Sequence, residues 1–318
     1  MTGRRHAALA AAILGLVMLA AVPAVSSAGP KPGHRHYHHH HKPKFVVGRG
    51  NLVAPLTIPA NPHPGPVPNC RKPSIKCVVS AARRLRNVEA AFGCDHRAVF
   101  ASTYRVLTQV MLQTLRADPH FFGNMRYLYF EDALFADVYI ANTRAWIAGK
   151  RVAPAWQTLF QVAASGDQNA AQDMLLGINA HVQNDMPFVI AALGTAPIKG
   201  GLTKADHDKE NEILGAAYQT VVDEIRRRYD PILDATNSSL TPLDDFAGLE
   251  LVKQWREDVW THANQLIAAK TPAERAEVTT QIEQNAENSA VEIGSAGVGF
   301  PGYRAQRDAY CATHNPDA

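Results

Sequence analysis

Two histidines in the sequence are each followed, one helical turn later, by a polar side chain that could share a ligand with it. The segment GINAHVQNDMPF contains His181 and Asp185, and the segment KADHDKEN contains His207 and Asn211. Neutral imidazole and carboxylate groups are ordinary zinc and manganese ligands. The sequence therefore predicts a divalent cation, zinc or manganese, held by His181, Asp185 and His207. Asn211 is predicted to be a further ligand.

Two more carboxylates could serve this site. Asp208 follows His207 directly and could take a proton from a metal-bound water, as a general base. Asp132, on a predicted helix that also bears Phe135 and Tyr139, could add an oxygen ligand. The function that these residues indicate is a metal-dependent hydrolase acting on a phosphate ester or a lipid.

A non-catalytic alternative stays open. A buried carboxylate is costly unless it is paired or coordinated, so the same His, Asp and Asn side chains could form a structural hydrogen-bond network. The protein would then be a cell-envelope or ligand-binding factor. The sequence contains no H-E-x-x-H, G-x-S-x-G or phosphate-binding glycine loop that would favour one reaction.

The elements that must position these residues are helices. Period-3.6 patterns dominate from Ser74 onward, and strand alternation is absent. Thr203 and Thr271 each stand three residues before an acid, which is typical of a capped helix start. We expect helices near residues 74–92, 97–116, 131–148, 154–164, 168–194, 204–229, 245–269 and 272–294. The fold class is all-α: about eight helices form one bundle domain over residues 71–294, followed by an irregular tail over 295–318.

Helical spacing places the candidate residues on the inner face. His181 and Asp185 share a stripe with apolar residues such as Ile178, and His207 and Asn211 lie in the first turn of the next long helix. Pro187 removes a helical N–H group, so we expect a kink there and a free carbonyl near residue 183.

The N-terminus has the composition of an export signal. MTGRRH is cationic, AALAAAILGLVMLAAV is an apolar stretch of signal-peptide size, and small residues precede a predicted cleavage after Ala28. The apolar run is shorter than the roughly 20 residues of a spanning helix. We therefore expect residues 1–28 to be removed and the protein to be secreted or associated with the cell envelope, with no transmembrane segment afterwards.

A basic arm is predicted over residues 29–70. It contains HRHYHHHHKPK, and half of the 20 prolines fall between Pro30 and Pro73, a composition that cannot bury enough apolar surface to fold. From Cys77 onward the chain has 22 basic and 29 acidic residues, a net charge of −7. The arm could hold to anionic cell-envelope polymers or bind metal ions through its histidines, or it could be a solvated spacer. An acidic domain and an arm poor in aromatic residues argue against nucleic-acid binding.

The four cysteines, Cys70, Cys77, Cys94 and Cys311, are expected to form disulfides in an exported chain. Four cysteines allow three pairings, and the sequence does not select one. One arrangement would join Cys77 to Cys94 across a helix and Cys70 to Cys311 across the termini of the domain. A zinc site is disfavoured because no two cysteines have two-to-four-residue spacing.

Six segments of the sequence resemble an uncharacterised, mainly actinobacterial family, domain-of-unknown-function family 5995. The segments are GCDHRAVFASTYRVLT, VAPAWQTLF, MLLGINAHVQNDMPFVIAALG, KADHDKENEIL, RRYDP and QWREDVWTHA. The resemblance spans roughly residues 74–290. It implies a helical fold and no established activity. The positions that match the family's signature are Cys94, His96, Asn179, His181, Asp185, Pro187, His207, Asp208 and Asn211.

Overall fold

The computed structural model describes residues 62–231, 243–295 and 302–317. The predicted signal segment and most of the predicted arm lie outside these residues. The last part of the predicted arm belongs to the packed domain instead. Val67 and Cys70 are buried, and the Asn69 amide donates hydrogen bonds of 2.7 and 2.8 Å to both carboxylate oxygens of Asp137.

The described residues form helices, and no strand occurs among them, which confirms the all-α prediction. None of these helices is both long and apolar enough to cross a membrane. The helices are α2 (Ile75–Phe92), α3 (Arg97–Ala117), α4 (Met125–Ile147), α5 (Pro154–Ser165), α6 (Ala170–Asn179), the π-helix η1 (Ala180–Asp185), α7 (Met186–Leu193), α8 (Lys204–Arg228), α10 (Leu243–Ala268), α11 (Pro272–Ser295) and α12 (Tyr303–His314).

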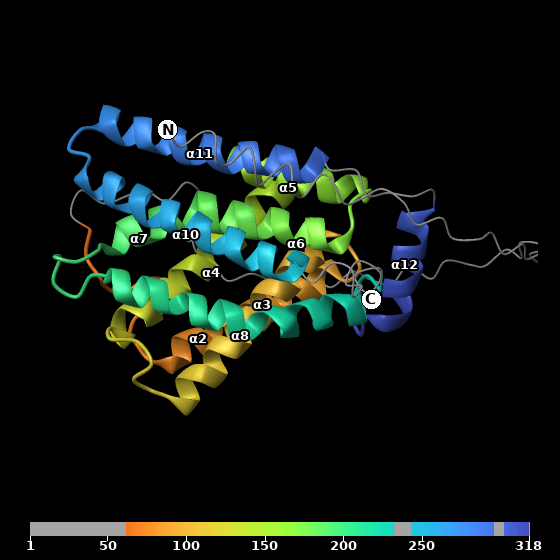
Figure 1. Cartoon of the computed structure of the whole chain (residues 1–318), viewed down its shortest axis with the longest axis horizontal. Coiled ribbons are helices and arrows are strands. Elements are labelled where there is room, and N and C mark those ends of the chain that lie inside the picture. Colours follow the sequence, from red (N-terminus) through yellow and green to blue (C-terminus); the bar gives the residue numbers. More distant parts are fainter. Residues whose placement is uncertain (1–61, 232–242, 296–301, 318) are drawn as a thin grey trace, which may run out of the picture. The chain divides into compact units, whose positions relative to one another are not determined.

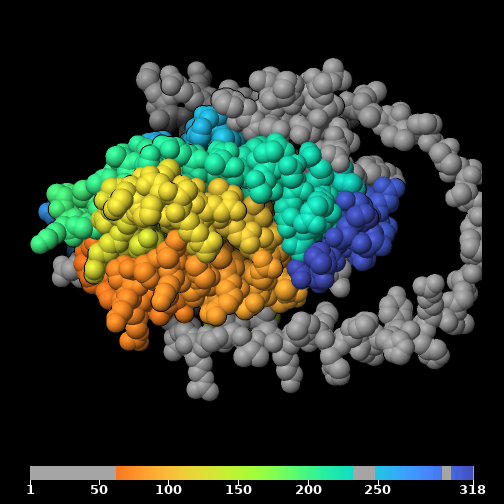
Figure 2. All heavy atoms as spheres, turned by 90° about the horizontal axis from the view of Figure 1, so that it is seen from below, coloured from red at the N-terminus to blue at the C-terminus, as the bar shows by residue number. Residues whose placement is uncertain are grey.

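The continuous rod α6–η1–α7 lies in the middle of the packed helices. It contacts α3 and α4 on one side, and α5, α10 and α11 on others (Figure 1). Helix α3 also packs against α2 and α8. In Figure 2, α2, α3, α8 and α12 lie at the surface of one face. The residues of η1 are therefore surrounded by helices from distant parts of the chain.

The rod departs from the single kinked helix that the sequence predicts. The Met186 N–H group donates to the His181 carbonyl, a bond across five residues, and the π-helix ends at Asp185, two residues before Pro187. Pro187 has no N–H group to donate, so the widened turn changes the hydrogen-bond register where the proline interrupts it. The result is a π-helical turn that contains both His181 and Asp185.

The described part of the predicted tail, residues 302–317, is mainly helical. Residues Tyr303–His314 form α12, an error of the sequence prediction. The buried face of α12 consists of Tyr303, Arg307 and Cys311. These side chains have helical spacing, but only one of the three is a typical core residue, so the apolar periodicity is weak.

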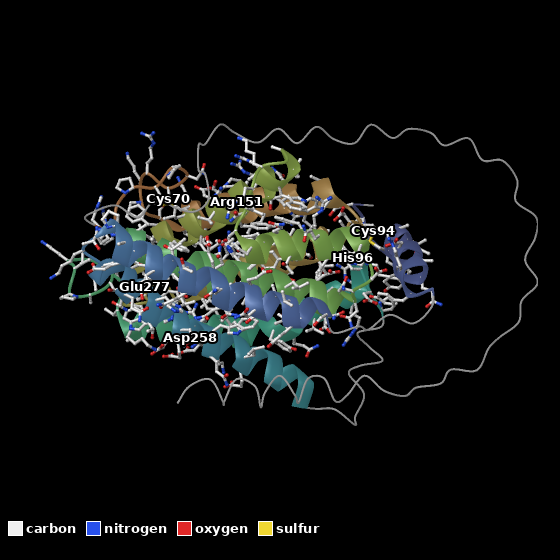
Figure 3. The ribbon with its side chains drawn as sticks, turned by 90° about the horizontal axis from the view of Figure 1, so that it is seen from above. Cys70, Cys94, His96, Arg151, Asp258 and Glu277 are labelled. Atoms are coloured by element: carbon white, nitrogen blue, oxygen red, sulfur yellow. A yellow bond between two sulfur atoms is a disulfide. The ribbon has the colours of Figure 1, made fainter. Side chains whose placement is uncertain are left out.

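All four cysteines are in disulfides, as predicted, in the pairs Cys70–Cys77 and Cys94–Cys311. The arrangement considered above, Cys77 with Cys94 and Cys70 with Cys311, is not the observed one. Helix α2 explains this, because it separates Cys77 from Cys94 by a rigid rod about 25 Å long. Figure 3 shows Cys70 and Cys94 at opposite ends of the bundle, with α12 beside Cys94.

Candidate ligand-binding cavity

A cavity of about 300 Å³ lies among α3, α4, the rod α6–η1–α7, α8 and α10. This volume is at the lower end of the ~300–1,000 Å³ that small-molecule sites span. Its wall is mainly aliphatic and aromatic. The lining side chains that carry polar groups are Thr103, Tyr104, Thr108, Glu131, Asp132, His181, Glu210, Tyr218 and Arg256.

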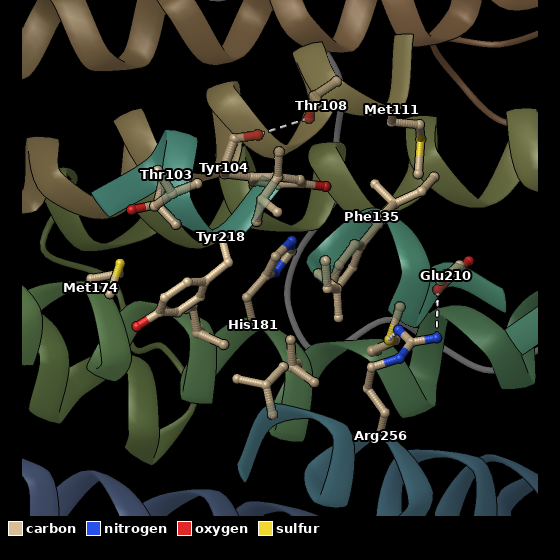
Figure 4. Close-up of a pocket in the computed structure, with 18 of the residues that line it drawn as sticks. Thr103, Tyr104, Thr108, Met111, Phe135, Met174, His181, Glu210, Tyr218 and Arg256 are labelled. Carbon is tan, nitrogen blue, oxygen red and sulfur yellow. Dashed lines mark hydrogen bonds and ion pairs between the residues drawn. The ribbon is translucent and has the colours of Figure 1, made fainter. Parts of the chain in front are cut away.

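Helical spacing brings these side chains to the cavity. Helix α3 contributes residues three and four apart, and α4 contributes Leu128, Glu131, Asp132 and Phe135 in the same way. In Figure 4, His181 lies in the middle of the cavity, with Met174 and Tyr218 toward one side and Glu210 and Arg256 toward the other. The two sides therefore differ in polarity.

His181 is oriented by Asp185, one turn further along the same π-helix. Its Nδ1 lies 3.0 Å from the Asp185 Oδ2, and both side chains are buried. An ionised carboxylate only accepts hydrogen bonds, so Nδ1 carries the proton and Nε2 is an acceptor. Nε2 is buried and has no hydrogen-bond partner among the described residues. The imidazole therefore offers an unused acceptor to the cavity.

The Asp185 carboxylate is also held by two donors from other helices and one from the same π-helix. The Trp156 indole N–H lies 3.1 and 3.0 Å from its two oxygens, the Asn184 amide donates at 2.8 Å, and the Asn142 amide donates at 3.4 Å. These neutral donors replace water around a buried anion. The sequence alone does not reveal these donors, because their roles depend on helix packing.

Aromatic rings enclose the His181 imidazole. The Phe135 ring stacks on it, with centroids 3.5 Å apart and planes within 6°, and the Tyr104 ring centroid lies 4.8 Å away. Burial lowers the pKa of His181, although Asp185 acts in the opposite direction. His181 is therefore neutral at pH 7. Burial also raises the pKa of Tyr104, whose hydroxyl has no hydrogen-bond partner in the described structure.

Carboxyl groups gather on the other side of the cavity. Glu131 is 2 % exposed and has no basic side chain or backbone N–H group as a hydrogen-bond partner in the described structure, and its carboxyl group lies within hydrogen-bonding reach of Glu210. Burial raises the pKa of Glu131 well above its usual range, and the nearby Glu210 raises it further. Burial raises the pKa of Asp132 to about 7, and its Oδ2 also lacks a partner there. Glu210 itself forms an ion pair of 2.7 Å with Arg256.

His207 does not line the cavity but supports Arg256. Its Nε2–H donates to the Arg256 carbonyl at 3.0 Å, and the Arg256 guanidinium donates to the His207 carbonyl and contacts its Nδ1 at 3.3 Å. Burial lowers the pKa of His207 to about 3, and Arg256 lowers it further. His207 is therefore a neutral residue that joins α8 to α10.

The remaining predicted ligands lie elsewhere. Asp208 is exposed and pairs with Lys204, and Asn211 is half-buried and does not line the cavity. The described partners of His181 and those of His207 form separate sets. Within the described residues, no group of three or more His, Cys, Asp or Glu side chains is arranged to hold a metal ion. The described residues therefore do not bring together the five predicted ligands of one cation, which are His181, Asp185, His207, Asn211 and Asp132.

Two other positions of the family signature, Cys94 and His96, lie at the end of the bundle away from Cys70 (Figure 3). The His96 Nδ1 lies 2.6 Å from Asp173 Oδ2, and Cys94 forms the disulfide to α12. Asn179, before the π-helix, donates to the Ala286 carbonyl at 2.8 Å and so joins the rod to α11. These contacts connect helices and involve no cavity residue, so we assign them a structural role.

Comparison with known proteins gives a family without an activity. The model of a family described as "Family of unknown function (DUF5995)" matches residues 78–295. No curated protein and no solved structure matches the chain. The match covers α2 to α11 and includes every residue of the cavity wall. The chain thus belongs to this family of unknown function, DUF5995.

Proposed function

We propose that the helical domain binds a small, largely apolar molecule in the cavity. The observation that carries this proposal is the His181 imidazole, oriented by Asp185 with an unpartnered Nε2 on an apolar wall. Apolar pockets with a few convergent polar groups are the common form of small-molecule sites.

The polar atoms indicate which ligand group meets them. His181 Nε2 is an acceptor, and the Tyr104 hydroxyl can donate or accept. A ligand hydroxyl or amine could donate to the imidazole while its lone pair accepts from the phenol. Buried polar atoms without partners are rare in folded proteins, because each costs about 1–3 kcal/mol. Several such atoms on one cavity wall are explained if a ligand satisfies them.

The binding test uses an uncharged environment-sensitive dye, N-phenylnaphthylamine, and its displacement by decanol. The wild-type protein should bind the dye at one saturable site. Ile178→Trp, which fills the cavity, should abolish binding. Val79→Trp, at an exposed position on α2, should leave binding unchanged.

Circular dichroism must show that both variants keep the wild-type helical content. If Ile178→Trp does not fold, the smaller Ile178→Phe replaces it. Dye binding that persists in a folded, cavity-filled variant would contradict the proposal, as would the lack of a saturable site in the wild type.

A second function, an enzymatic one, is favoured by the same His181–Asp185 pair. A carboxylate-oriented neutral imidazole is the arrangement of a general base. His181 Nε2 could accept a proton from water while the water oxygen attacks an apolar ester, then return that proton to the leaving alcohol. Hydrolysis of a panel of nitrophenyl esters that is lost in His181→Ala would support this function. Equal rates in both proteins would exclude it for these esters.

We also infer that the protein works outside the cytoplasm. Two disulfides are typical of oxidising compartments, and the apolar N-terminal stretch has the composition of an export signal. The arm would then meet the anionic polymers of the cell envelope.

A further inference from the structure

The polar side of the cavity has more acid than base. Glu131, Asp132 and Glu210 line it, and Arg256 is the one cationic side chain among the lining residues. Arg256 is already engaged, because it pairs with Glu210 and donates to the His207 carbonyl and to Met186 Sδ. The two adjacent carboxyl groups of α4, Glu131 and Asp132, therefore form no ion pair among the described residues, and the Glu131 carboxyl meets only the carboxyl group of Glu210.

No other cation in the described structure forms an ion pair with Glu131 or Asp132, although the charge of Arg84 partly offsets the effect of burial on the pKa of Asp132. Arg84 of α2 lies near Asp132 but forms its ion pair with Asp137, which also accepts from Asn69. No hydrogen bond joins Arg84 to Asp132 among the described contacts. Glu131 and Asp132 are 2 % and 8 % exposed, so bulk water does not solvate them as it would at the surface.

We propose, on the basis of the proposed ligand-binding function, that the cavity ligand carries an amine, which binds as an ammonium group against Glu131 and Asp132. An ammonium group has a positive charge and three donors, which match the unpartnered carboxyl oxygens. The hydrocarbon part of the ligand would lie along Phe135, Ile178 and Leu214. The ligand class is thus a small amphiphilic amine.

Affinity for such a ligand depends on pH. Without a ligand, burial raises the pKa of Glu131 and brings that of Asp132 to about 7, so both hold protons in mildly acidic solution. An ammonium group favours the ionised carboxylates, so binding releases protons and tightens from pH 5 to pH 8. The other ionisable groups that face these acids are Tyr104 of α3, Tyr127 of α4, His181 of η1, Glu210 of α8, Arg256 of α10, and Arg84 and Asp137 beyond the cavity.

The experiment compares decylamine, decanol and decanoate as competitors of the dye, using the whole protein. Decylamine should displace the dye at a concentration at least about tenfold lower than decanol, as expected when a charge pair forms away from water. Decanoate should be the weakest competitor. Raising the pH from 5 to 8 should increase the affinity for decylamine and leave that for decanol unchanged.

Variants locate the effect. Asp132→Asn and Glu131→Gln should each reduce decylamine affinity about tenfold and leave decanol affinity unchanged. Asp208→Asn is the matched control, because it removes an exposed carboxylate of α8 that does not line the cavity.

The outcomes separate the two proposals. If decanol and decylamine bind equally well, or decanoate binds best, the amine inference is overturned while the binding function stands. If no compound displaces the dye and the dye does not bind, the binding function itself fails. If the variants lower decanol affinity as much as decylamine affinity, the carboxyl groups shape the cavity and do not recognise an amine.

Discussion

His207 and Arg256 form reciprocal hydrogen bonds: the imidazole donates to the arginine carbonyl, and the guanidinium donates to the histidine carbonyl. The first turn of α8 is thereby attached to the middle of α10. The same guanidinium pairs with Glu210 on the cavity wall, so this contact also fixes the position of the cavity's cation.

Removal of the His207 side chain should destabilise the protein. His207→Ala leaves the Arg256 carbonyl and one guanidinium donor without their partner, so we expect a loss of about 1–3 kcal/mol in the free energy of unfolding. Urea denaturation measures this loss. Added zinc should not change the difference between variant and wild type, because the imidazole nitrogens are occupied by Arg256. Stabilisation of the wild type alone by zinc would contradict this role.

Asp132 should make stability depend on pH. Its pKa is about 7 in the folded protein and 3.8 in the unfolded chain, so the folded state holds the proton over this range. The contribution of Asp132 to the free energy of unfolding is fully present below pH 4. It is lost as the pH rises from 4 to 7, and it does not change further above pH 7. Asp132→Asn should therefore become more stable than the wild type, by up to about 4 kcal/mol at pH 8.

Urea denaturation of both proteins between pH 4 and pH 8 measures this difference. Subtracting the two profiles removes most of the contribution of the other ionisable groups. A wild type that gains stability relative to the variant as the pH rises would mean that Arg84 stabilises the Asp132 carboxylate in the folded state.

Gly177 should not tolerate a side chain. A Cβ atom at this position would lie 2.1 Å from the Phe100 Cγ, so α3 could not remain this close to α6. Gly177→Ala should lower the free energy of unfolding by about 1–3 kcal/mol or more. Gly215→Ala, on the exposed face of α8, meets only ordinary contacts and should instead stabilise the protein by about 1 kcal/mol. Thermal denaturation of both variants checks the contrast.

Export gives a chemical prediction for the mature chain. Mass spectrometry of protein collected from the medium or the cell envelope should show a start at or near Gly29 and no alkylatable thiol before reduction. A start at Met1, or cysteines that react without reductant, would contradict the inference that the protein is exported.

The sequence predicts the helices well because apolar residues at helical spacing mark each buried face. It also predicts that His181 and Asp185 point inward, since four residues separate them on one helix. It does not reveal that Trp156 and Asn142 hold Asp185, because those contacts depend on how α4, α5 and η1 pack. It places Asp132 at the candidate site but does not single out Glu131, for a similar reason.

A carboxylate in a helix usually indicates a solvated face, and only the packed helices show that α4 is buried around Glu131. The error at α12 arose because Arg307 forms part of its buried face. In each case the missing information was the identity of a partner distant in the chain.

The Cys94–Cys311 bond closes the chain between these residues into a covalent ring. Every residue of the cavity wall lies within this ring. A single proteolytic cut anywhere in that ring opens it without releasing a fragment. The two pieces would migrate as one species in a non-reducing gel and separate only after reduction. A nicked protein could thus keep its cavity helices together, and a gel run without reductant would not reveal the break.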